Sequence, residues 1–361
     1  MPVPDVQESL RLLREIGSPP TAPFHEEGPR AAIERELERI GVEFRRDSWG
    51  NVLASHLRGD DARPVALVAH MDHPAFDVVE TRGTTARAKV RGGLFRETFR
   101  PPVPILICRD DGDTIPAKGS DLTYEIELEN YSIGHLGLEA DRPLRVGDWG
   151  ILDLPPFEHA GDDVRMRAAD DLAGCALMLS VLAALTSDPR PHELHAVFTR
   201  AEEPGLFGAR LIADERALPP DTIVVSIETS RELPGAVHAR GPVIRVGDFH
   251  HTFDDVAESY LRVAAERIAP LPTQRMLMYG GTCEGSAFID AGYATTAIAM
   301  PLRNYHNAGR DGAAPEIISL SDFRSAAALL HETVIAAAED AVEAYRVTTG
   351  PVSEEIKKLL R

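Results

Sequence analysis

The segment Val65-Ala-Leu-Val-Ala-His-Met-Asp72 decides the fold of this chain. Its first five residues are an unbroken apolar run, which is typical of a strand that is buried on both faces of a sheet. His70 and Asp72 follow directly after this run. In open α/β sheets, ligands bind at the carboxyl ends of the strands, so the segment predicts both a buried sheet and a site at its edge.

Helices and strands alternate on both sides of this segment. Apolar residues recur at helical spacing over 5–16 and 27–40, and two strands are predicted at 42–46 and 52–57. The elements predicted beyond residue 160 are a helix at 170–185, a strand at 193–199, a helix at 205–213, a strand at 222–227, a helix at 254–268, a strand at 294–300 and a helix at 320–346. This alternation predicts an α/β fold, with a mixed central sheet and helices on both of its faces.

The character of the sequence changes over residues 76–160. Short runs of Val, Ile, Leu and Thr are separated there by breakers such as Gly92-Gly93 and Pro101-Pro102, and no helical pattern is evident. We therefore expect a small, barrel-like all-β domain at 76–160, inserted into an α/β domain formed by 1–75 and 161–361. A length of 361 residues agrees with two domains.

Charge and cysteine usage restrict the partners and the compartment. The chain has 38 basic and 57 acidic residues and a net charge of −19, which argues against binding to nucleic acid or to anionic membranes. Its three cysteines, Cys108, Cys175 and Cys283, are far apart and form no C-x-x-C pair, which favours a reducing compartment. No secretory leader is evident, and the longest apolar run is too short for a bilayer, so we expect a cytoplasmic protein.

Residues with metal-binding chemistry gather at the predicted strand ends. Each type alone is common in proteins, but the predicted sheet would deliver all of them to one edge. They are His70 and Asp72 after the first buried strand, Asp170 at a loop–helix junction, Glu202 and Glu203 after the strand at 193–199, Glu228 after the strand at 222–227, and His306 beyond the strand at 294–300.

Two imidazoles and several carboxylates, without a thiolate, suit Zn²⁺, Co²⁺ or Mn²⁺. A pair of such ions can activate a water and polarise a carbonyl at once, and an aspartate can bridge them through its two oxygens. A carboxylate that binds no metal must then accept the proton of the water. The adjacent Glu202 and Glu203 can divide these two tasks, so the pattern predicts a two-metal hydrolase that cleaves amide bonds.

Several of these residues also have simpler interpretations. Asp170 could be an ordinary helix N-cap, since an aspartate there accepts a bond from the first-turn N–H groups. His192-Glu-Leu-His195 is not a zinc-binding H-E-x-x-H helix, because it opens a predicted strand and its histidines would face opposite sides. His250-His251 lies in a predicted loop, where it could be a surface feature or could contact substrate.

Taken together, the motifs resemble those of the tetrahedral and glutamyl aminopeptidase-type family of two-metal, or co-catalytic zinc, aminopeptidases. The resemblance spans most of the chain in order and spacing. Its segments are Gly50-Asn51-Val52, Val68-Ala-His70-Met-Asp72, Asp170-Asp171-Leu-Ala-Gly174, Ala201-Glu202-Glu203-Pro-Gly205 with Gly208-Ala209, Gly280-Gly-Thr282, and Pro301-Leu-Arg303-Asn-Tyr-His306.

The resemblance implies a zinc exopeptidase-like fold and a role for each residue. His70 and Glu228 would bind one ion, Glu203 and His306 the other, and Asp170 would bridge them. Glu202 would be the general base, and Asp72 would orient the ring of His70. The ions would be zinc or cobalt, with manganese as an alternative, and the inserted β domain would take part in homo-oligomer assembly.

Four departures from the family pattern concern substrate preference and assembly. The chain has Glu228 where the family usually has Asp, His73-Pro74 after Asp72, Leu172 in place of arginine, and Cys283 in place of aspartate after Gly-Gly-Thr. The function predicted is an aminopeptidase acting on peptides. The alternatives are a related deacylase or N-acyl amino acid hydrolase and a catalytically silent metal-binding protein, although a mere binder would have no need of a base such as Glu202.

Overall fold

The computed structural model describes residues 3–99, 103–128, 131–342 and 352–360. Its centre is an eight-stranded sheet. Along the sheet the strands are β1 (Glu43–Arg46), β2 (Val52–Arg58), β12 (His192–Thr199), β3 (Pro64–His70), β13 (Ile223–Arg231), β16 (Ala294–Leu302), β14 (Val243–Gly247) and β15 (Gln274–Leu277).

The middle of this sheet is parallel and its flanks are mixed. Strands β12, β3, β13 and β16 run in one direction, while β2 and β14 pair with them antiparallel. Every residue of β3 is buried, as its unbroken apolar run predicts. The four parallel strands therefore end at the same edge, and the predicted α/β class with a mixed sheet is confirmed.

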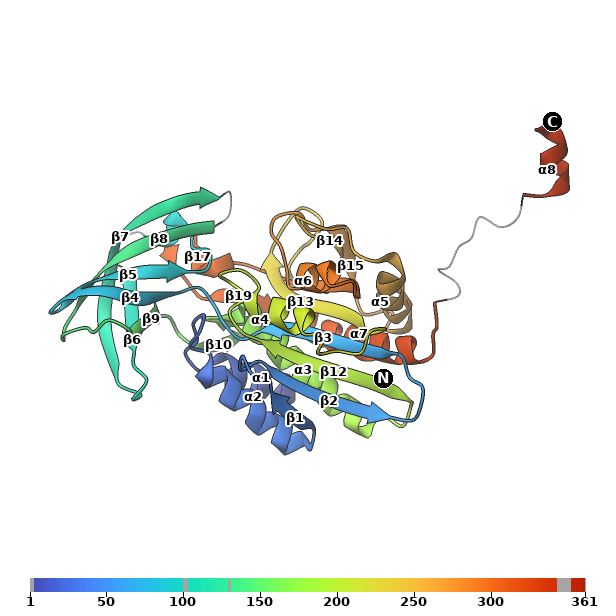
Figure 1. Cartoon of the computed structure of the whole chain (residues 1–361), viewed down its shortest axis with the longest axis horizontal. Helices are drawn as coiled ribbons and strands as arrows, with labels where there is room; N and C mark the ends of the chain where they lie inside the picture. Colours follow the sequence, from blue (N-terminus) through green and yellow to red (C-terminus); the bar gives the residue numbers. More distant parts are fainter. Residues whose placement is uncertain (1–2, 100–102, 129–130, 343–351, 361) are drawn as a thin grey trace.

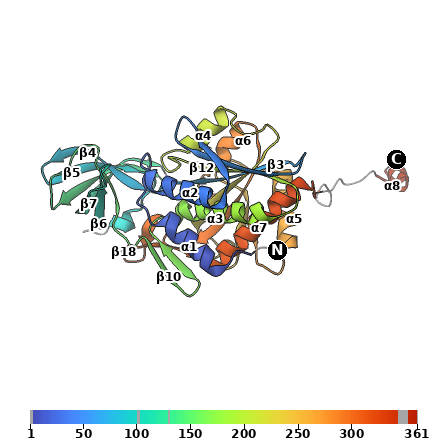
Figure 2. The same ribbon diagram turned by 90° about the horizontal axis from the view of Figure 1, so that it is seen from below.

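Helices cover both faces of the sheet (Figures 1 and 2). One face packs into the main core cluster with α1 (Val6–Gly17), α2 (Glu27–Ile40), α3 (Ala169–Ser187), α5 (Asp255–Arg267) and α7 (Leu320–Ala338). The opposite face packs against the shorter α4 (Phe207–Asp214) and α6 (Gly285–Asp290). Helix α8 (Glu354–Leu359) lies apart from this body (Figure 1).

Helix α3 is mainly apolar after its first turn, which carries Asp170 and Asp171. Among the described residues it alone is long and apolar enough to cross a membrane, and 83% of its most apolar window is buried inside the protein. It packs against α1 and α7 and against strands β3 and β13. Its composition therefore reflects its place in the core of the fold.

A closed barrel projects from one end of the α/β body (Figure 1). Its strands, in order around the barrel, are β4 (Ala75–Arg82), β5 (Thr85–Arg91), β8 (Tyr131–Ala140), β7 (Thr114–Leu128), β6 (Val103–Cys108) and β9 (Trp149–Leu152), with the short helix η1 (Arg96–Phe99) after β5. The barrel has its own apolar core, which includes Phe76, Ile105 and Leu136. An inserted all-β barrel is thus confirmed as part of the fold.

Short strands complete the structure near the base of the barrel. Strand β11 (Asp163–Met166) pairs with β10 (Phe157–Ala160) on one side and with β19 (Glu316–Ser319) on the other. Two strands of two residues each, β17 (Ala308–Gly309) and β18 (Gly312–Ala313), pair with each other shortly before β19 in the sequence. Residue 160, the predicted end of the insert, is the last residue of β10, just before the turn to β11.

Three details of the predicted elements differ from the structure. Strand β13 continues to Arg231, so Glu228 lies inside the strand and does not follow it. Helix α7 ends at Ala338, and residues 343–346 of the helix predicted there lie outside the described residues. Strands β14 and β15 and helix α6 were not predicted.

Candidate active site

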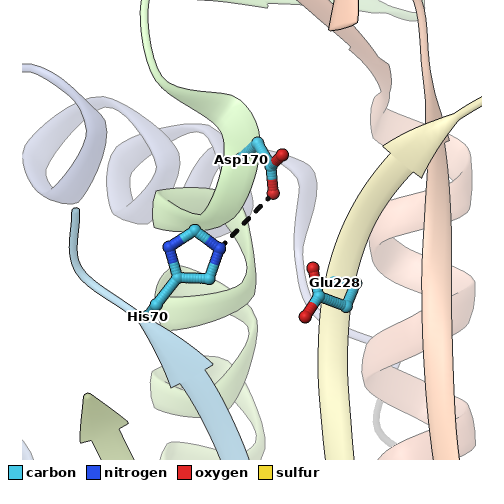
Figure 3. A group of neighbouring side chains, drawn as sticks. All are labelled: His70, Asp170 and Glu228. Carbon is cyan, nitrogen blue, oxygen red and sulfur yellow. Dashed lines mark ion pairs between the residues drawn. The ribbon is translucent and has the colours of Figure 1, made fainter. Parts of the chain in front are cut away.

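His70, Asp170 and Glu228 converge at the edge where the parallel strands end (Figure 3). His70 is the last residue of β3, and Glu228 lies in the neighbouring β13, two residues beyond the paired Val68 and Ser226. The His70 Nε2 atom is 3.6 Å from Asp170 Oδ1. One ligand atom from each of the three residues lies within 4.8 Å of the others, which is close enough for one ion.

A second group of three shares Asp170. Ligand atoms of Asp170, Glu203 and His306 also lie within 4.8 Å of one another. His306 Nε2 is 3.4 Å from Asp170 Oδ2 and 3.5 Å from Glu203 Oε1. The two carboxylate oxygens of Asp170 therefore face different histidines, which is the arrangement that a ligand between two ions requires.

Asp170 does not cap helix α3. Its backbone is extended, with φ −83° and ψ 104°, and its neighbour Asp171 takes the capping position. Asp171 Oδ1 accepts the N–H of Gly174 at 3.2 Å, which is the usual N-cap pattern. A Cβ at Gly174 would lie 2.1 Å from Asp171 Oδ2, so only glycine fits there. This division leaves the carboxylate of Asp170 to the site.

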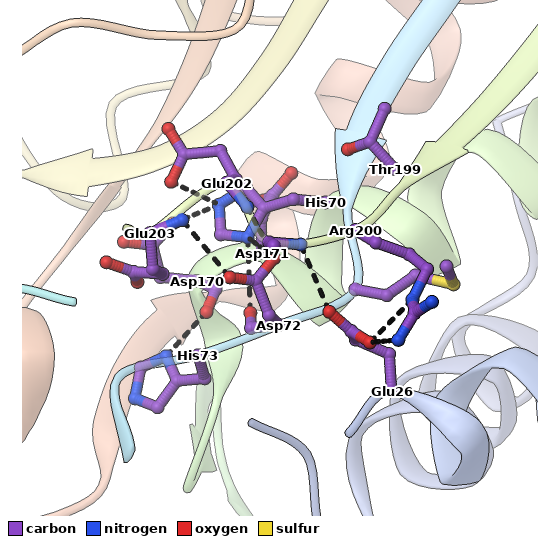
Figure 4. A network of polar contacts seen from close by, with 12 residues as sticks. Glu26, His70, Asp72, His73, Asp170, Asp171, Thr199, Arg200, Glu202 and Glu203 are labelled. Carbon is purple, nitrogen blue, oxygen red and sulfur yellow. Dashed lines mark hydrogen bonds and ion pairs between the residues drawn. The ribbon is translucent and has the colours of Figure 1, made fainter. Parts of the chain in front are cut away.

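Asp72 links His70 to the two glutamates (Figure 4). Its carboxylate accepts the backbone N–H of Glu202 at 2.9 Å and that of Glu203 at 3.1 Å. The same carboxylate is 3.6 Å from His70 Nδ1, which also lies 3.1 Å from the Asp72 carbonyl oxygen. One buried side chain thus holds the turn that carries Glu202 and Glu203 and also faces the ring of His70.

Residues from the first part of the chain hold the same turn from outside (Figure 4). Asn51 Oδ1 accepts the N–H of Arg200 at 2.9 Å, and Glu26 Oε1 accepts the N–H of Ala201 at 3.0 Å. The Arg200 side chain donates to Glu26 Oε2 at 2.7 Å. The Gly-Asn pair at 50–51 therefore belongs to the support of the Glu-Glu turn.

Two supporting residues were not foreseen from the sequence. Glu316 accepts the N–H of Asp170 at 2.9 Å and that of His306 at 2.8 Å. It therefore holds the backbone of two members of the second group. His73 Nδ1 is 2.6 Å from the Asp170 carbonyl oxygen. His73 was noted only as a departure from the family pattern, and Glu316 follows no motif that would single it out.

The site gathers several buried carboxylates, which bound cations would stabilise. Burial raises the pKa of Glu203, with Glu202 and Asp170 adding to the effect, and burial likewise raises the pKa of Glu228 to about 8. Burial opposes ionisation of Asp170 too, but its contacts with His306 and His70 lower its pKa. Within the described chain, Glu203 Oε1 and Glu228 Oε1 are buried without a hydrogen-bond partner. Metal ions would supply the missing partners, so the residues fit them.

Glu202 lies beside both groups but belongs to neither. It is 7% exposed, and its Oε2 atom is 3.8 Å from His70 Nε2. Burial raises its pKa well above 4.5, while the neighbouring His70 acts in the opposite direction. A buried carboxylate with a raised pKa that binds no ion is suited to accept and return a proton.

A cavity of about 90 Å³ lies over the two groups. Besides the predicted site residues, its lining includes Phe95 from the barrel, Arg245 and Met278 from the far side of the sheet, and Tyr305. The ring of Tyr305 stacks on that of His306 with centroids 3.8 Å apart. Arg245 was not foreseen, although an arginine within the apolar Val243–Val246 run was a usable signal.

The other histidine pairs lie outside the site. On β12, His192 contacts His56 and His195 contacts Ser55, both at 2.8 Å across the sheet. His250 and His251 do not reach the metal-binding groups, but they line a neighbouring groove.

Fold and site together define a metal-dependent peptidase built on a mixed α/β sheet. Residues 138–329 match the M42 glutamyl aminopeptidases, more than half of the chain, and the chain belongs to this family. It is 25% identical over 329 residues to the glutamyl aminopeptidase of Lactococcus lactis subsp. cremoris, covering 83% of this chain and 89% of that protein. The predicted resemblance is confirmed, and the protein is a metal-dependent aminopeptidase, a hydrolase of peptide bonds.

Solved structures support the same fold at lower identity. An aminopeptidase from the archaeon Desulfurococcus kamchatkensis superimposes with a TM-score of 0.79 at 19% identity, over 96% of this chain and 99% of that one. The TET1 peptidase of Pyrococcus horikoshii, which can assemble into a tetrahedron or a large octahedral shell, gives 0.75 at 20% identity, over 90% and 99%.

Proposed function

We propose that the protein removes N-terminal residues from peptides with two divalent ions, zinc or cobalt in the first place and manganese as an alternative. His70 and Glu228 would hold one ion, Glu203 and His306 the other, and Asp170 both. The observation that carries this proposal is that two three-residue groups share Asp170 and present a different oxygen of it to each histidine.

Two ions bound there would lower the pKa of a water between them and polarise the scissile carbonyl. The protein's own contribution is the movement of a proton and the fixing of geometry. The Glu202 carboxylate accepts a proton from the attacking water and returns it to the leaving amine. Asp72 keeps Glu202 and Glu203 in place through their backbone N–H groups, so the base and the ligand cannot shift independently.

We propose that the preferred N-terminal residue is acidic. Arg245 lines the metal cavity from β14 and is 4% exposed, and its Nε atom is buried without a hydrogen-bond partner. Its side chain forms no ion pair with the described residues, and the carboxylates of Glu228 and Asp248 act on it only at longer range. A buried guanidinium without a carboxylate partner is costly, and the side chain of an N-terminal Glu or Asp would supply one. The name of the Lactococcus relative, a glutamyl aminopeptidase, agrees with this preference.

Glutamyl and glutaminyl anilides test this proposal because they differ in charge and hardly in shape. The wild-type protein with added Zn²⁺, Co²⁺ or Mn²⁺ should prefer the glutamyl anilide by roughly 10- to 100-fold in kcat/KM. Arg245→Met should abolish this preference, and Arg245→Lys, which keeps the charge, should retain part of it. Equal rates on both anilides in the wild-type protein would contradict an acidic preference.

N-acyl amino acids belong in the same panel. A deacylase with the same metal chemistry would hydrolyse them, because they carry the acyl group that it recognises. It would leave the anilides intact, because these carry a free α-amino group in its place. Hydrolysis of neither class with any of the three ions would indicate a catalytically silent metal-binding protein. Turnover of the anilides alone would support the aminopeptidase.

We further propose that the chain forms a homo-oligomer through the inserted barrel, taken as a domain at 76–160. The support is that the TET1 peptidase of Pyrococcus horikoshii, which shares the fold, can assemble into a tetrahedron or a large octahedral shell. A cytoplasmic location is proposed from the three cysteines, all of which are buried and free of disulfides.

A further inference from the structure

A second and larger cavity adjoins the metal cavity. It has a volume of about 890 Å³, within the range of sites that enclose a whole small ligand. Glu203 and Thr282 line both cavities, so the two lie next to each other beside a residue proposed to bind metal. We call the larger cavity the basic groove, after the residues described next.

The basic groove runs between the barrel and the α/β body. Strand β5 of the barrel supplies Lys89 and Arg91, and helix α4 supplies Phe207 and Arg210 on the opposite side. Its remaining wall includes His251, whose Nδ1 is 2.8 Å from Ser286 Oγ and whose Nε2 is 3.3 Å from Asp290.

The side chains of Lys89 and Arg210 form no hydrogen bond or ion pair within the described part of the chain. Arg91, by contrast, is paired with Asp77 at 2.6 Å. Three acidic residues also line the groove: Asp290 faces His251, Asp214 is exposed, and Glu203 is the residue proposed to bind metal. In a chain of net charge −19, a groove with free cations next to a catalytic centre is suited to an anionic part of the substrate.

We propose that the basic groove binds the part of the peptide that follows the scissile bond, and that Lys89 and Arg210 receive the free C-terminal carboxylate of a short peptide. The proposal rests on the proposed function, which places the N-terminal side chain in the metal cavity near Arg245. The rest of the peptide must leave that cavity, and the groove borders it at Glu203. Phe207, 39% exposed, offers an apolar surface along the way.

Peptides with and without a C-terminal charge test the proposal. The test compares Glu-Ala-Ala with its C-terminal amide. The same comparison is repeated with peptides of two to five residues. At low salt, kcat/KM should favour the free acid by roughly 3- to 10-fold, and this ratio should fall as salt is added because the cations are solvent-accessible. It should be largest at one peptide length, since each residue moves the carboxylate by about 3.4 Å.

Variants assign the effect to the groove. Arg210→Met combined with Lys89→Met should bring the acid-to-amide ratio close to 1, and Arg210→Lys should keep most of it. Arg35→Met is the matched control, because Arg35 is an exposed arginine on α2 that lines neither cavity. This control should retain the full ratio.

A wild-type ratio of 1 at every length, or a ratio that survives in the double variant, would overturn the proposal. If the double variant instead changes the oligomer mass in light scattering and leaves the ratio intact, the groove is a subunit contact. If no peptide or anilide is hydrolysed, the proposed function fails on its own. Calorimetric binding of the tripeptide and its amide to metal-loaded Glu202→Gln then still decides whether the groove prefers the free carboxylate.

Discussion

Asp170 has the densest set of contacts among the residues of the site. Its two oxygens face His70 and His306, its N–H is held by Glu316, and Thr229 donates to its Oδ1 at 3.2 Å. Every feature that orients this carboxylate comes from a different element of the fold. Loss of the side chain should therefore affect both groups of ligands at once.

We expect Asp170→Ala to lower the bound metal by more than one equivalent, because both ions lose a ligand. Elemental analysis of the purified protein measures this directly. Asp171→Asn is the matched control, since Asp171 caps α3 and belongs to neither group of ligands. Loss of a single equivalent in Asp170→Ala, with loss of more than one equivalent in Asp171→Asn, would show that Asp170 is terminal and that Asp171 is the bridge.

The neighbours Glu202 and Glu203 should behave differently when each is changed to glutamine. Glu202→Gln should keep its metal near the wild-type level and lose about 10²- to 10⁴-fold in kcat, since the amide retains the shape and loses the base. Glu203→Gln should lose metal first. If Glu202→Gln kept more than a third of wild-type turnover, another group would have to be the base.

The candidate metal ligands could be selected from the sequence more readily than the residues that hold them in position. His70, Asp170, Glu203, Glu228 and His306 stand out as a set, because the predicted sheet delivers all of them to one edge although each type alone is common. Glu316 could not be selected, because its role consists of two backbone N–H contacts that exist only once β19 is folded against the site.

At the scale of elements, helix α4 shows how closely the structure around the site is packed. Gly208 is the second residue of α4, and a Cβ there would lie 2.5 Å from Asn51 Oδ1 and 2.6 Å from backbone atoms of Arg200. The helix thus approaches the backbone that leads into the Glu-Glu turn. No side chain fits between them.

We expect Gly208→Ala to destabilise the protein despite the better helix propensity of alanine. Propensity alone would stabilise by about 1 kcal/mol, but displacing backbone and the held Asn51 costs about 2 kcal/mol or more. The measurement is the thermal midpoint. Gly280→Ala, where an added Cβ meets nothing within 4 Å, is the control and should leave the midpoint near that of the wild type. An increase in the midpoint of Gly208→Ala would refute this account.

Elements with a long periodic pattern were predictable, whereas several short ones were not. Strand β3 and helices α1, α2 and α3 have runs whose period is evident, and they occur close to where it predicts. Strand β14 was missed because Arg245 interrupts its apolar run, and β15 and α6 because four and six residues carry too little pattern. Only tertiary contacts define such elements.

The whole molecule combines an α/β body with a barrel whose ends lie together. Strand β4, which opens the barrel, pairs with β9, which closes it, through Phe76 and Gly150. The chain therefore leaves the body and returns to it at neighbouring points. Since the barrel also has its own core, it can be replaced without a long connection.

We expect the full-length protein to self-associate, so that light scattering at micromolar concentration gives a mass well above 39.3 kDa. Replacing Ala75–Leu152, the barrel strands, with a short linker should give a monomer. The cut stops before β10, because β10 and β11 extend the sheet of β19 and belong structurally with it. A full-length protein that already scatters as a monomer would argue against assembly through the barrel.

Gly92, at the end of the barrel strand β5, has a consequence for how such enzymes can diversify. Its φ is +88°, and a Cβ there would lie 3.0 Å from the side chain of Glu203. A chimera that received the barrel of a distant relative would import a foreign residue against Glu203, a proposed metal ligand, along with a new wall for the neighbouring groove. Recombination of whole inserts would therefore alter activity together with architecture, and these two traits would be inherited as a unit.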